Sequence, residues 1–426
     1  MFSKNKNKSE LMKEKLKNKC EDFSFKVIKK GPNHARLGEI STNHGKISTP
    51  YFVPVATSAV IKGVSPEKLK EIGAECTLSN TYHLHLRPGE DIVKKHGGLH
   101  TFMNFNRPIF TDSGGFQAFS LGVGLTGKVG KMGNFINPAK NSSKNKSKKT
   151  EKKAFAKVTD KGVNFRSIYD GTKHFFDAKT SMKIQSKLGA DIIMAFDECS
   201  SVSHDKEYVR IAMKRTHDWA LKSLKYKDKK QALYGIIQGG PFKDLREEST
   251  DFISSLPFEG IAIGGSFGDS YGDSKKGMLS VLDWIIPKLD KRPRHLLGIG
   301  DIDDIFECVE RGIDTFDCVM PTRIARRGNL YILPESGGNL KNKFRIAIKN
   351  SKYRKDLSPI DKNCTCSTCK NYSKSYLRHL FVTDEVVYHE LAVTHNLHFM
   401  LNLMKEIRES LKKEYFNDLK KKWLGK

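Results

Sequence analysis

The sequence lacks any apolar run long enough to cross a membrane, since a span needs about 20 consecutive, mostly apolar residues. It also lacks a secretory signal, because its first residues, MFSKNKNKSELMKEKLKNK, contain no apolar core, and they carry Glu but no Arg, unlike a transit peptide. We therefore expect a cytoplasmic protein whose residues 1–22 form a disordered basic tail. Ordered structure is predicted to start near Phe23, where Phe23, Phe25 and Val27 alternate as in a strand.

Cysteine is scarce, and eight Cys in 426 residues do not suggest a disulfide framework. Three of them nevertheless cluster as Cys364, Cys366 and Cys369, which favours a metal site. Three thiolates and one imidazole make a closed, structural zinc site. Spacing alone leaves the fourth ligand open among His379, His389, His395 and His398.

Acidic residues are few relative to basic ones, with 48 Asp and Glu against 75 Lys and Arg and a formal net charge of +27. This excess favours a polyanionic partner, and nucleic acid is the first expectation. Much of the Lys lies in segments that can serve solubility alone: the N-terminal tail, a low-complexity basic insert at about residues 122–157, and a basic tail at residues 416–426. The charge therefore indicates a kind of partner but not its binding site.

Short apolar segments alternate with helical patterns through most of the chain. Strands are predicted at residues 51–56, 75–80, 108–112, 191–197, 233–238, 260–264, 295–300 and 314–319. Helices are predicted between them at residues 66–72, 178–188, 208–224, 242–256, 276–288 and 302–311. Eight such units imply an α/β protein with a closed (β/α)8 TIM barrel at residues 23–345. A hairpin turning at Asp170-Gly171 interrupts the alternation, and a zinc-binding subdomain with a C-terminal helix is expected at residues 346–415.

Two carboxylates stand out at predicted strand ends. Asp317 lies in the apolar segment TFDCVM, and Arg323, Arg326 and Arg327 follow it closely. Asp112 begins DSGGFQ, in which two glycines allow the backbone to turn tightly against a ligand. Each Asp alone can be a structural cap, but a pair supplies the nucleophile and the proton carrier that glycosidic chemistry needs. Strand ends meet at one face of a barrel, where active sites lie.

Several other polar groups are predicted at the same face. Asp197 can accept hydrogen bonds from the Watson–Crick edge of a purine, and Gln238 offers an amide to a base. Bare backbone at Gly264 and Gly265 can approach a ligand, and Phe116 can stack on it. A core or turn role remains the alternative for each of them.

Together these residues resemble one known family, the tRNA-guanine transglycosylases, which exchange a base in tRNA during queuosine formation. The resemblance runs from about Phe23 to Leu411. It is carried by DSGGFQ at Asp112, DEC at Asp197, IIQGG at Gln238, AIGG at Gly264, LLGIG at Gly298, GIDTFDCVMPTR at Asp317, CxCxxC at Cys364 and HNLHF at His395. It implies a (β/α)8 barrel with an inserted zinc subdomain.

The resemblance also implies roles for individual residues. Asp317 is similar to the nucleophile that attacks C1′ of the guanosine ribose, and Asp112 to the group that accepts and donates protons for the two bases. Base binding is implied for Asp112, Ser113, Gly114, Gly115, Phe116, Asp197, Gln238, Gly264 and Gly265. RNA contacts are implied for Gly298, Ile299, Gly300, Asp301, Ile302, Asp303, Asp304, Thr322, Arg323, Ile324, Ala325 and Arg326. Zinc ligation is implied for Cys364, Cys366, Cys369 and His395, a choice of histidine that rests on the resemblance alone.

The substrates implied are tRNAs with GUN anticodons, modified at position 34, and a queuine or preQ1 base. The chain ends soon after the zinc region, which favours position 34 over position 15. Gly268 leaves room for the larger queuine, whereas Cys199 matches the preQ1-using pattern, and queuine is the expectation. The resemblance also implies a homodimer or a heterodimer with a non-catalytic paralogue.

Two other classes stay open. A non-catalytic tRNA-binding partner subunit would need neither Asp112 nor Asp317. A two-carboxylate barrel hydrolase acting on a nucleoside or glycoside would need neither the basic loop nor the zinc subdomain.

Overall fold

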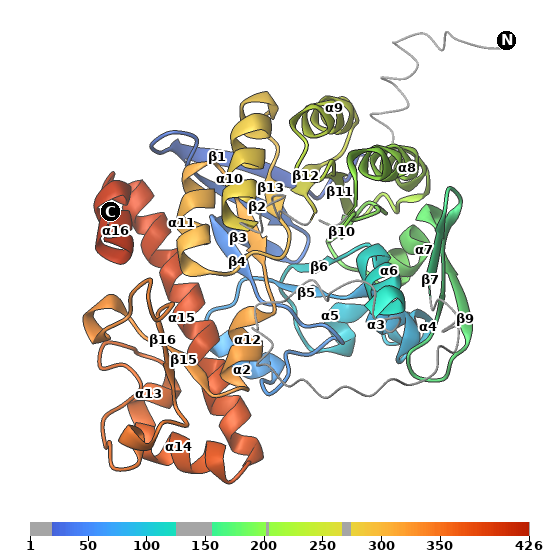
Figure 1. Ribbon diagram of the computed structural model, residues 1–426. Helices are drawn as coiled ribbons and strands as arrows, with labels where there is room; N and C mark the ends of the chain where they lie inside the picture. Colours follow the sequence, from blue (N-terminus) through green and yellow to red (C-terminus); the bar gives the residue numbers. More distant parts are fainter. Residues whose placement is uncertain (1–18, 125–155, 202–203, 266–273, 426) are drawn as a thin grey trace, which may run out of the picture.

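Eight short parallel strands form the centre of the molecule. The computed structural model describes residues 19–124, 156–201, 204–265 and 274–425 (Figure 1). The strands are β4 (Tyr51–Val53), β5 (Thr77–Ser79), β6 (Ile109–Thr111), β10 (Ile192–Met194), β11 (Ala232–Ile237), β12 (Gly260–Ile263), β13 (Arg294–Leu296) and β14 (Thr315–Asp317). They pair in the order β4-β14-β13-β12-β11-β10-β6-β5, and a parallel bridge between Val55 and Leu78 joins the two outer strands. The predicted closed barrel and all eight of its strands are therefore confirmed.

Helices surround this barrel, as the alternating pattern predicts (Figure 1). They are α2 (Pro66–Glu71), α3 (Thr81–Leu86), α4 (Glu90–Lys95), α5 (Leu99–Phe102), α6 (Gly115–Gly124), α7 (Ala178–Leu188), α8 (Lys206–Tyr226), α9 (Lys243–Ser254), α10 (Ser274–Ile285), α11 (Ile302–Glu310) and α12 (Met320–Ala325). A 3-10 turn, η1 (Ile286–Lys288), follows α10. Local signals set these limits: Asp177 caps α7 by accepting from the Thr180 N–H at 2.7 Å, and Gly189 ends it at φ +72°.

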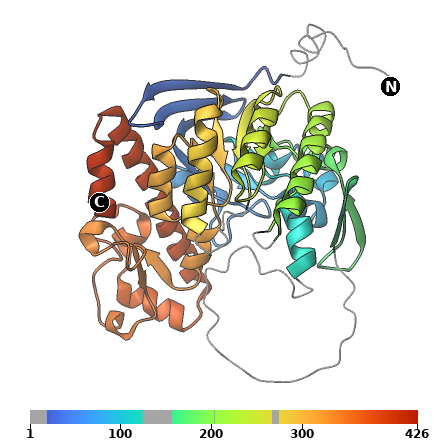
Figure 2. The same cartoon turned by 45° about the horizontal axis from the view of Figure 1, so that its top comes forward.

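A small antiparallel sheet covers the end of the barrel where the strands begin. It consists of β1 (Ser24–Lys30), β2 (Arg36–Thr42) and β3 (Gly45–Thr49), seen at the top of Figure 2. Phe23 packs edge-on against Tyr234 of β11, and Arg36 donates to Asp314 just before β14. Cys20 is buried and donates its N–H to Glu259 at 2.9 Å, so order begins before the predicted Phe23.

The region predicted as a low-complexity insert is bounded by regular structure. Residues 125–155 lie outside the described residues, but α6 extends to Gly124 and β7 (Ala156–Thr159) starts before residue 157. β7 pairs with β8 (Gly162–Arg166), which pairs with β9 (Lys173–Phe176). The hairpin predicted at Asp170-Gly171 is β8–β9.

The C-terminal region packs along one side of the barrel (Figure 1). Its elements are β15 (Asn329–Tyr331), η2 (Pro334–Ser336), β16 (Arg345–Ala347), η3 (Ser351–Tyr353), α13 (Ser367–Asn371), α14 (Lys374–Val382), α15 (Val386–Lys412) and α16 (Phe416–Leu424). The long helix α15 contacts α12, α13, α14 and β15. It therefore joins the cysteine-rich segment to the barrel.

The prediction of a basic tail at residues 416–426 is wrong. Phe416 and Trp423 are buried on the inner face of α16 and contact Phe306 of α11. Lys420, from the run expected to be solvated, pairs with Glu307 at 3.0 Å and Glu310 at 2.7 Å. The apolar residues recur at helical spacing, and the barrel offers a surface on which to bury them. Within the described residues, no helix combines the length and the apolar composition that a membrane crossing requires.

Candidate active site and metal centre

Asp112 lies directly after β6, at the end of the barrel where the strands finish. Its Oδ1 accepts from the Thr81 N–H at 2.8 Å, and its Oδ2 accepts from the amide of Asn80. Burial, against the opposing effect of the Thr81 N–H, and the charge of Asp317 together raise the pKa of Asp112 to about 7. A carboxyl group with this pKa can both give and take a proton near neutral pH.

Asp317 ends β14, on the other side of the same opening. Its Oδ1 accepts from the Gly298 N–H at 3.2 Å and lies 3.1 Å from His295 Nε2. Both carboxylates lie where strands of the same barrel finish, and the charge of Asp317 contributes to the raised pKa of Asp112. Their sequence positions are far apart, and the barrel brings them together.

Asp197 and Gln238 form the wall of the site beside Asp112. Asp197 accepts from Ser113 Oγ at 3.0 Å and from Gln238 Nε2 at 2.8 Å, and it is 7% exposed. Burial raises the pKa of Asp197 to about 6 although both neighbours donate to it. Gln238 Oε1 is buried without a partner among the described residues, which leaves it for a ligand.

Glycines keep this wall close to the ligand space. A Cβ at Gly115 would lie 2.8 Å from the Asp197 carbonyl oxygen, and one at Gly264 would lie 2.6 Å from Gln238 Nε2. Gly265 has φ +118°, which other residues rarely adopt. Ser113 and Gly114 are buried in the turn before α6, and Phe116 is half-buried in its first turn. Residues 266–273, with Gly268, lie outside the described part of the chain.

The structure adds two groups that the sequence did not single out. Arg246 is fully buried and donates to the carbonyl oxygens of Ile237, Gly240 and Gly264 at 3.1, 2.7 and 2.8 Å, which holds the ends of β11 and β12. His295 is fully buried beneath Asp317. The only available signal for His295 was a polar residue at the start of the predicted strand at residues 295–300.

The two segments expected to contact RNA differ in charge. In the segment from Gly298 to Asp304, Asp301 pairs with Arg345 at 2.8 Å and Asp304 with Lys275 at 3.1 Å, so these acids are already neutralised. In the other, Arg323 and Arg327 are exposed and Arg326 is half-buried, whereas Thr322 and Ala325 are buried. Burial and the neighbouring charges of Arg323 and Arg327 lower the pKa of Arg326. Only the second segment presents an anion-attracting surface.

The predicted cysteine cluster forms a compact group with His395. The Nδ1 atom of His395 lies 3.7, 3.5 and 3.3 Å from Sγ of Cys364, Cys366 and Cys369, respectively. Ligands of one tetrahedral ion, with bonds of about 2.0 to 2.3 Å, stand roughly 3.5 Å apart. The His395 Nε2 donates to the Tyr331 carbonyl oxygen at 2.8 Å, which turns Nδ1 toward the thiols. These four residues can hold a metal ion.

Among the histidines left open by spacing, His395 has the closest geometry. His398 Nδ1 lies 3.6 Å from Cys364 Sγ, but that ring also contacts Thr365 and Asn402. His395 is fully buried and reaches all three thiols.

A second group of possible ligands lies at the opposite end of the barrel. His44 Nδ1 and His100 Nε2 are 2.6 and 3.0 Å from the two oxygens of Asp191. These are direct hydrogen bonds, shorter than the roughly 3.3 Å between ligands of one ion. The group ties the turn between β2 and β3, and helix α5, to Asp191 directly before β10, which is a structural role.

A parallel barrel with two carboxylates where its strands end, and a Cys3His group in the C-terminal region, is the arrangement that the resemblance to base-exchanging glycosyltransferases implies. A family model described as Queuine tRNA-ribosyltransferase matches residues 32–426. An Archaeoglobus fulgidus protein is 50% identical over 401 residues, which cover 93% of this chain and 98% of the relative. Relatives named queuine tRNA-ribosyltransferase include one from Thermoanaerobacter sp. (strain X514), 43% identical over 408 residues covering 95% of this chain and 97% of the relative. Another, from Desulforamulus reducens, is 44% identical over 391 residues covering 91% and 94%, respectively.

The chain therefore belongs to the queuine tRNA-ribosyltransferase family, the tRNA-guanine transglycosylases. The resemblance inferred from its motifs is confirmed.

Proposed function

We propose that this protein exchanges guanine at wobble position 34 of tRNAs with GUN anticodons for queuine or preQ1, through a covalent ribosyl-aspartate intermediate. The observation that carries the proposal is the presence of Asp317 and Asp112 where strands of one barrel end, together with the pKa of Asp112 of about 7, which suits a proton carrier. The reaction is assigned to the cytoplasm, where tRNA is modified.

In the first half-reaction, an Asp317 oxygen attacks ribose C1′ and the C1′–N9 bond breaks. The electron pair passes to guanine, and Asp112 protonates the leaving base. In the second half-reaction, Asp112 takes a proton from the entering base, whose nitrogen attacks C1′ and releases the Asp317 carboxylate. Two displacements retain the configuration at C1′, and the covalent step gives ping-pong kinetics.

Asp197, Gln238, Gly264 and Gly265 are assigned to the edges of the base and Phe116 to its face. The carboxylate of Asp197 has lone pairs beyond those used by Ser113 and Gln238, so it can still accept from a purine. The unpartnered Gln238 Oε1 supports the same assignment.

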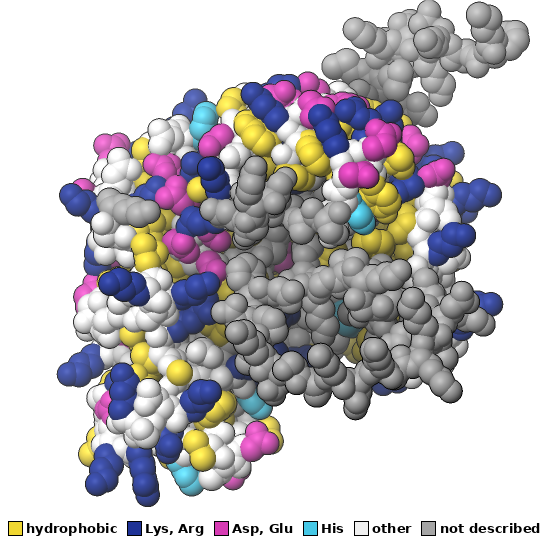
Figure 3. Space-filling model, in the orientation of Figure 1, with side chains coloured by type: hydrophobic (Ala, Val, Ile, Leu, Met, Phe, Trp, Pro, Cys, Tyr) yellow, Lys and Arg dark blue, Asp and Glu magenta, His cyan; other side chains and the backbone are white. Residues whose placement is uncertain are grey.

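The tRNA is assigned to the basic surface that follows the nucleophile strand. Arg323 and Arg326 on and after α12 would contact phosphate near the wobble position. Basic side chains are also visible over the C-terminal region, at the lower left of Figure 3. The exposed cations of this region include Lys349, Lys352, Arg354, Lys355, Lys362 and Lys370. In the other expected segment, the role proposed for the acids is to form ion pairs within the protein rather than to contact tRNA phosphate. These acids are Asp301, Asp303 and Asp304.

Zinc is the metal assigned to Cys364, Cys366, Cys369 and His395. Thiolate and imidazole donors in a closed set of four suit structural Zn²⁺. The domain limits proposed are a barrel up to residue 345 and a zinc-binding region after it.

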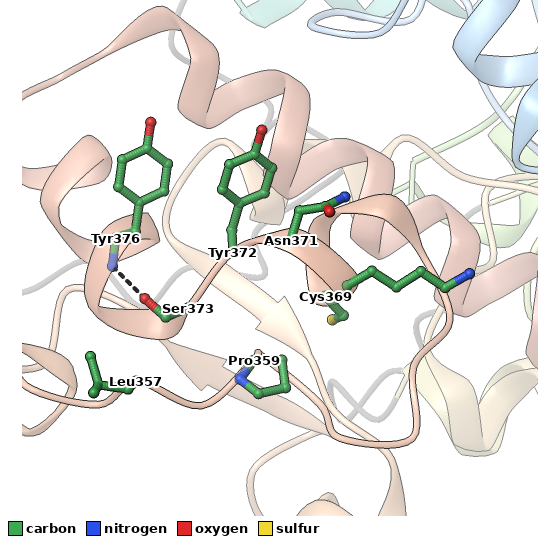
Figure 4. A pocket seen from close by; sticks show the side chains of 8 residues that line it. Leu357, Pro359, Cys369, Asn371, Tyr372, Ser373 and Tyr376 are labelled. Atoms are coloured by element: carbon green, nitrogen blue, oxygen red, sulfur yellow. Dashed lines mark hydrogen bonds between the residues drawn. The ribbon is translucent and has the colours of Figure 1, made fainter.

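A second copy of the chain is assigned to the exposed face around α14. Tyr372 and Tyr376 stack with centroids 5.4 Å apart and are 37% and 42% exposed (Figure 4). Leu357 below them is 84% exposed, and Val386, at the start of α15, is 81% exposed. The change Tyr376→Arg should shift the sedimentation coefficient from dimer to monomer, while Tyr226→Arg on α8 should not. A monomeric wild-type protein would contradict this assignment.

Incubation with a GUN-anticodon tRNA and labelled guanine tests the exchange. Label should enter this tRNA but not a variant lacking guanine at position 34. Binding without incorporation would favour a partner subunit, and release of free guanine without replacement would favour a hydrolase.

Competition between queuine and preQ1 for the same tRNA tests which base enters. Queuine is expected to be preferred, and Gly268→Val should reduce its use more than that of preQ1. An unchanged preference for preQ1 in both proteins would show that Gly268 does not set the pocket.

A further inference from the structure

A buried hydrogen-bonded chain runs up the barrel interior to the carboxylate of Asp317. Thr315 and Asp317 stand two residues apart on β14, so their side chains share one face of the strand. Thr315 pairs with His295 on the neighbouring strand β13. Thr315 Oγ1 lies 2.9 Å from His295 Nδ1, and His295 Nε2 lies 3.1 Å from Asp317 Oδ1.

The surroundings of His295 hold its ring in this orientation. The side chain is fully buried, and its ring stacks on Phe110 of β6 with centroids 5.6 Å apart and planes at 27°. Rotation of the ring would break both polar contacts inside an apolar core. The imidazole is therefore a fixed part of the barrel rather than a mobile group.

The ionised form of Asp317 determines which nitrogen of His295 carries the proton. A carboxylate only accepts, so Nε2 must be the donor to Oδ1. In the neutral ring Nδ1 is then the acceptor, and the hydroxyl of Thr315 donates to it. Each hydrogen bond is therefore donated in the same direction, from Thr315 to His295 and from His295 to Asp317.

The two oxygens of Asp317 differ as a result. Oδ1 receives the His295 Nε2–H and the Gly298 N–H at 3.2 Å. Oδ2 has no hydrogen-bond partner within the part of the chain that the structure describes. Oδ1 is anchored and Oδ2 is left for the reacting carbon.

We infer that His295 is a positioning residue that fixes Asp317 so that Oδ2 attacks ribose C1′, with Thr315 fixing the tautomer of the ring. This inference rests on the proposed exchange reaction. As the Oδ2–C1′ bond forms, the C1′–N9 bond breaks and Asp112 protonates guanine, while Oδ1 becomes the carbonyl oxygen of the ester. When the second base attacks, the electron pair of the Oδ2–C1′ bond returns to the carboxylate, and both donors stabilise the charge on Oδ1.

Two substitutions at His295 separate positioning from simple packing. In His295→Gln the amide nitrogen stands near the place of Nε2 and can still donate to Asp317. In His295→Asn the amide is one atom shorter, stands near the place of Nδ1 and cannot reach Oδ1. Loss of one preorganised donor costs about 10²-fold or more in rate.

We expect His295→Asn to lower kcat for guanine exchange and the single-turnover rate of adduct formation by about 100-fold. The KM for tRNA should stay within about twofold, and His295→Gln should recover activity to within about tenfold of the wild type. Equal rates in the Asn variant and the wild type would overturn the inference. So would equal losses in the Asn and Gln variants.

Substitutions at Thr315 provide an independent test if His295→Asn fails to fold. Thr315→Val keeps the shape and removes the hydroxyl, whereas Thr315→Ser keeps the hydroxyl. The Val variant should lose activity, and the Ser variant should retain it. Equal activity of the two variants would show that the Thr315 hydroxyl does not help to orient His295. If the wild type exchanges no guanine, the proposed function fails, whereas an active wild type with an equally active His295→Asn variant refutes only the positioning role.

Discussion

At the scale of single residues, the site gives one side-chain type two different tasks. Asp112 and Asp317 are both aspartates at strand ends, but their surroundings differ. Burial and the charge of Asp317 raise the pKa of Asp112 to about 7, so it can exchange protons. Asp317 instead has its Oδ1 held by the Gly298 N–H and by His295 Nε2. Environment, rather than residue type, therefore suits Asp112 to the proposed role of proton carrier and Asp317 to the proposed role of nucleophile.

The first prediction concerns Asp317. Changing it to Asn or Ala should abolish guanine exchange, because no ester to C1′ can form. Affinity for tRNA should survive, since Arg323 and Arg326 are unchanged. Denaturing gel electrophoresis of the protein with GUN-anticodon tRNA should show a covalent adduct for the wild type only. Substantial exchange by the Asp317→Ala variant would sink the nucleophile assignment.

The second prediction concerns pH and Asp112. Asp112 must be protonated to release guanine, and a carboxyl with pKa about 7 is protonated below that value. Single-turnover adduct formation should therefore fall as pH rises through about 7. Protonated Asp112 also contributes to the free energy of unfolding. This contribution is fully present below the pKa that Asp112 has in the unfolded chain, and it is lost as pH rises through the folded-state pKa of about 7.

Asp112→Asn provides the control for both effects, because an amide does not ionise. Its melting temperature should lack the decline assigned to Asp112 between about pH 4 and 7. A wild-type adduct rate that is flat across pH 7 would remove Asp112 as the proton donor.

At the scale of elements, α15 connects the metal group to α12, the helix that follows β14. His395 on α15 belongs to the Cys3His group, and the next residue, Asn396, donates to the carbonyl oxygens of Pro321 and Asn329 at 3.0 and 3.1 Å. Tyr388, at the start of the same helix, donates to the Ala325 carbonyl oxygen at 3.0 Å. The metal group thereby holds α12, which carries the basic surface assigned to tRNA.

The third prediction concerns this metal group. Freshly purified protein should contain one zinc per chain, and Cys366→Ala should lose it together with order in the C-terminal region. Proteolysis should then cut after residue 345 while the barrel stays resistant. Cys308→Ala, which removes a buried thiol of α11 outside the group, should retain the metal. Protein without zinc in elemental analysis would contradict the assignment.

At the scale of the whole molecule, some basic side chains are buried in ion pairs and others are exposed. The net charge is +27, but many cations inside the fold are paired, such as Lys227 with Glu259 and Arg36 with Asp314. Exposed cations instead occur after β14 and over the C-terminal region. The exposed Arg323 and Arg327 therefore lie shortly after the strand that carries Asp317.

The fourth prediction follows from this distribution. Binding of tRNA should weaken steeply with salt, because each neutralised phosphate releases counterions. Arg323→Gln should reduce the slope of log K against log salt by about one, as expected for one lost phosphate contact. Lys94→Gln on α4 serves as a surface control and should leave the slope unchanged. A flat salt dependence of the wild type would mean that the net charge does not bind tRNA.

Much of the fold was determined by the sequence alone. Apolar segments alternating with helical patterns specified all eight barrel strands, because the period of the apolar residues is a local property. Caps such as Asp177 and Gly189 set the limits of α7 in the same way. The cysteine spacing predicted a metal site, since few other structural roles require three thiols so close together. The types of residue at the strand ends indicated a two-carboxylate site.

Only the tertiary structure decided how distant residues meet. The register of the barrel placed His295 under Asp317 and brought Asp112 within reach of its charge, and neither follows from local periodicity. The sequence of helix α16 was interpreted as a basic tail because its Lys run lies among four buried apolar residues, and Phe416 and Trp423 pack on Phe306 of another element. Packing between α13 and α15 placed His395, rather than His398, within reach of all three thiols. Side-chain proximity and burial depend on contacts between remote segments, and these exist only once the chain has folded.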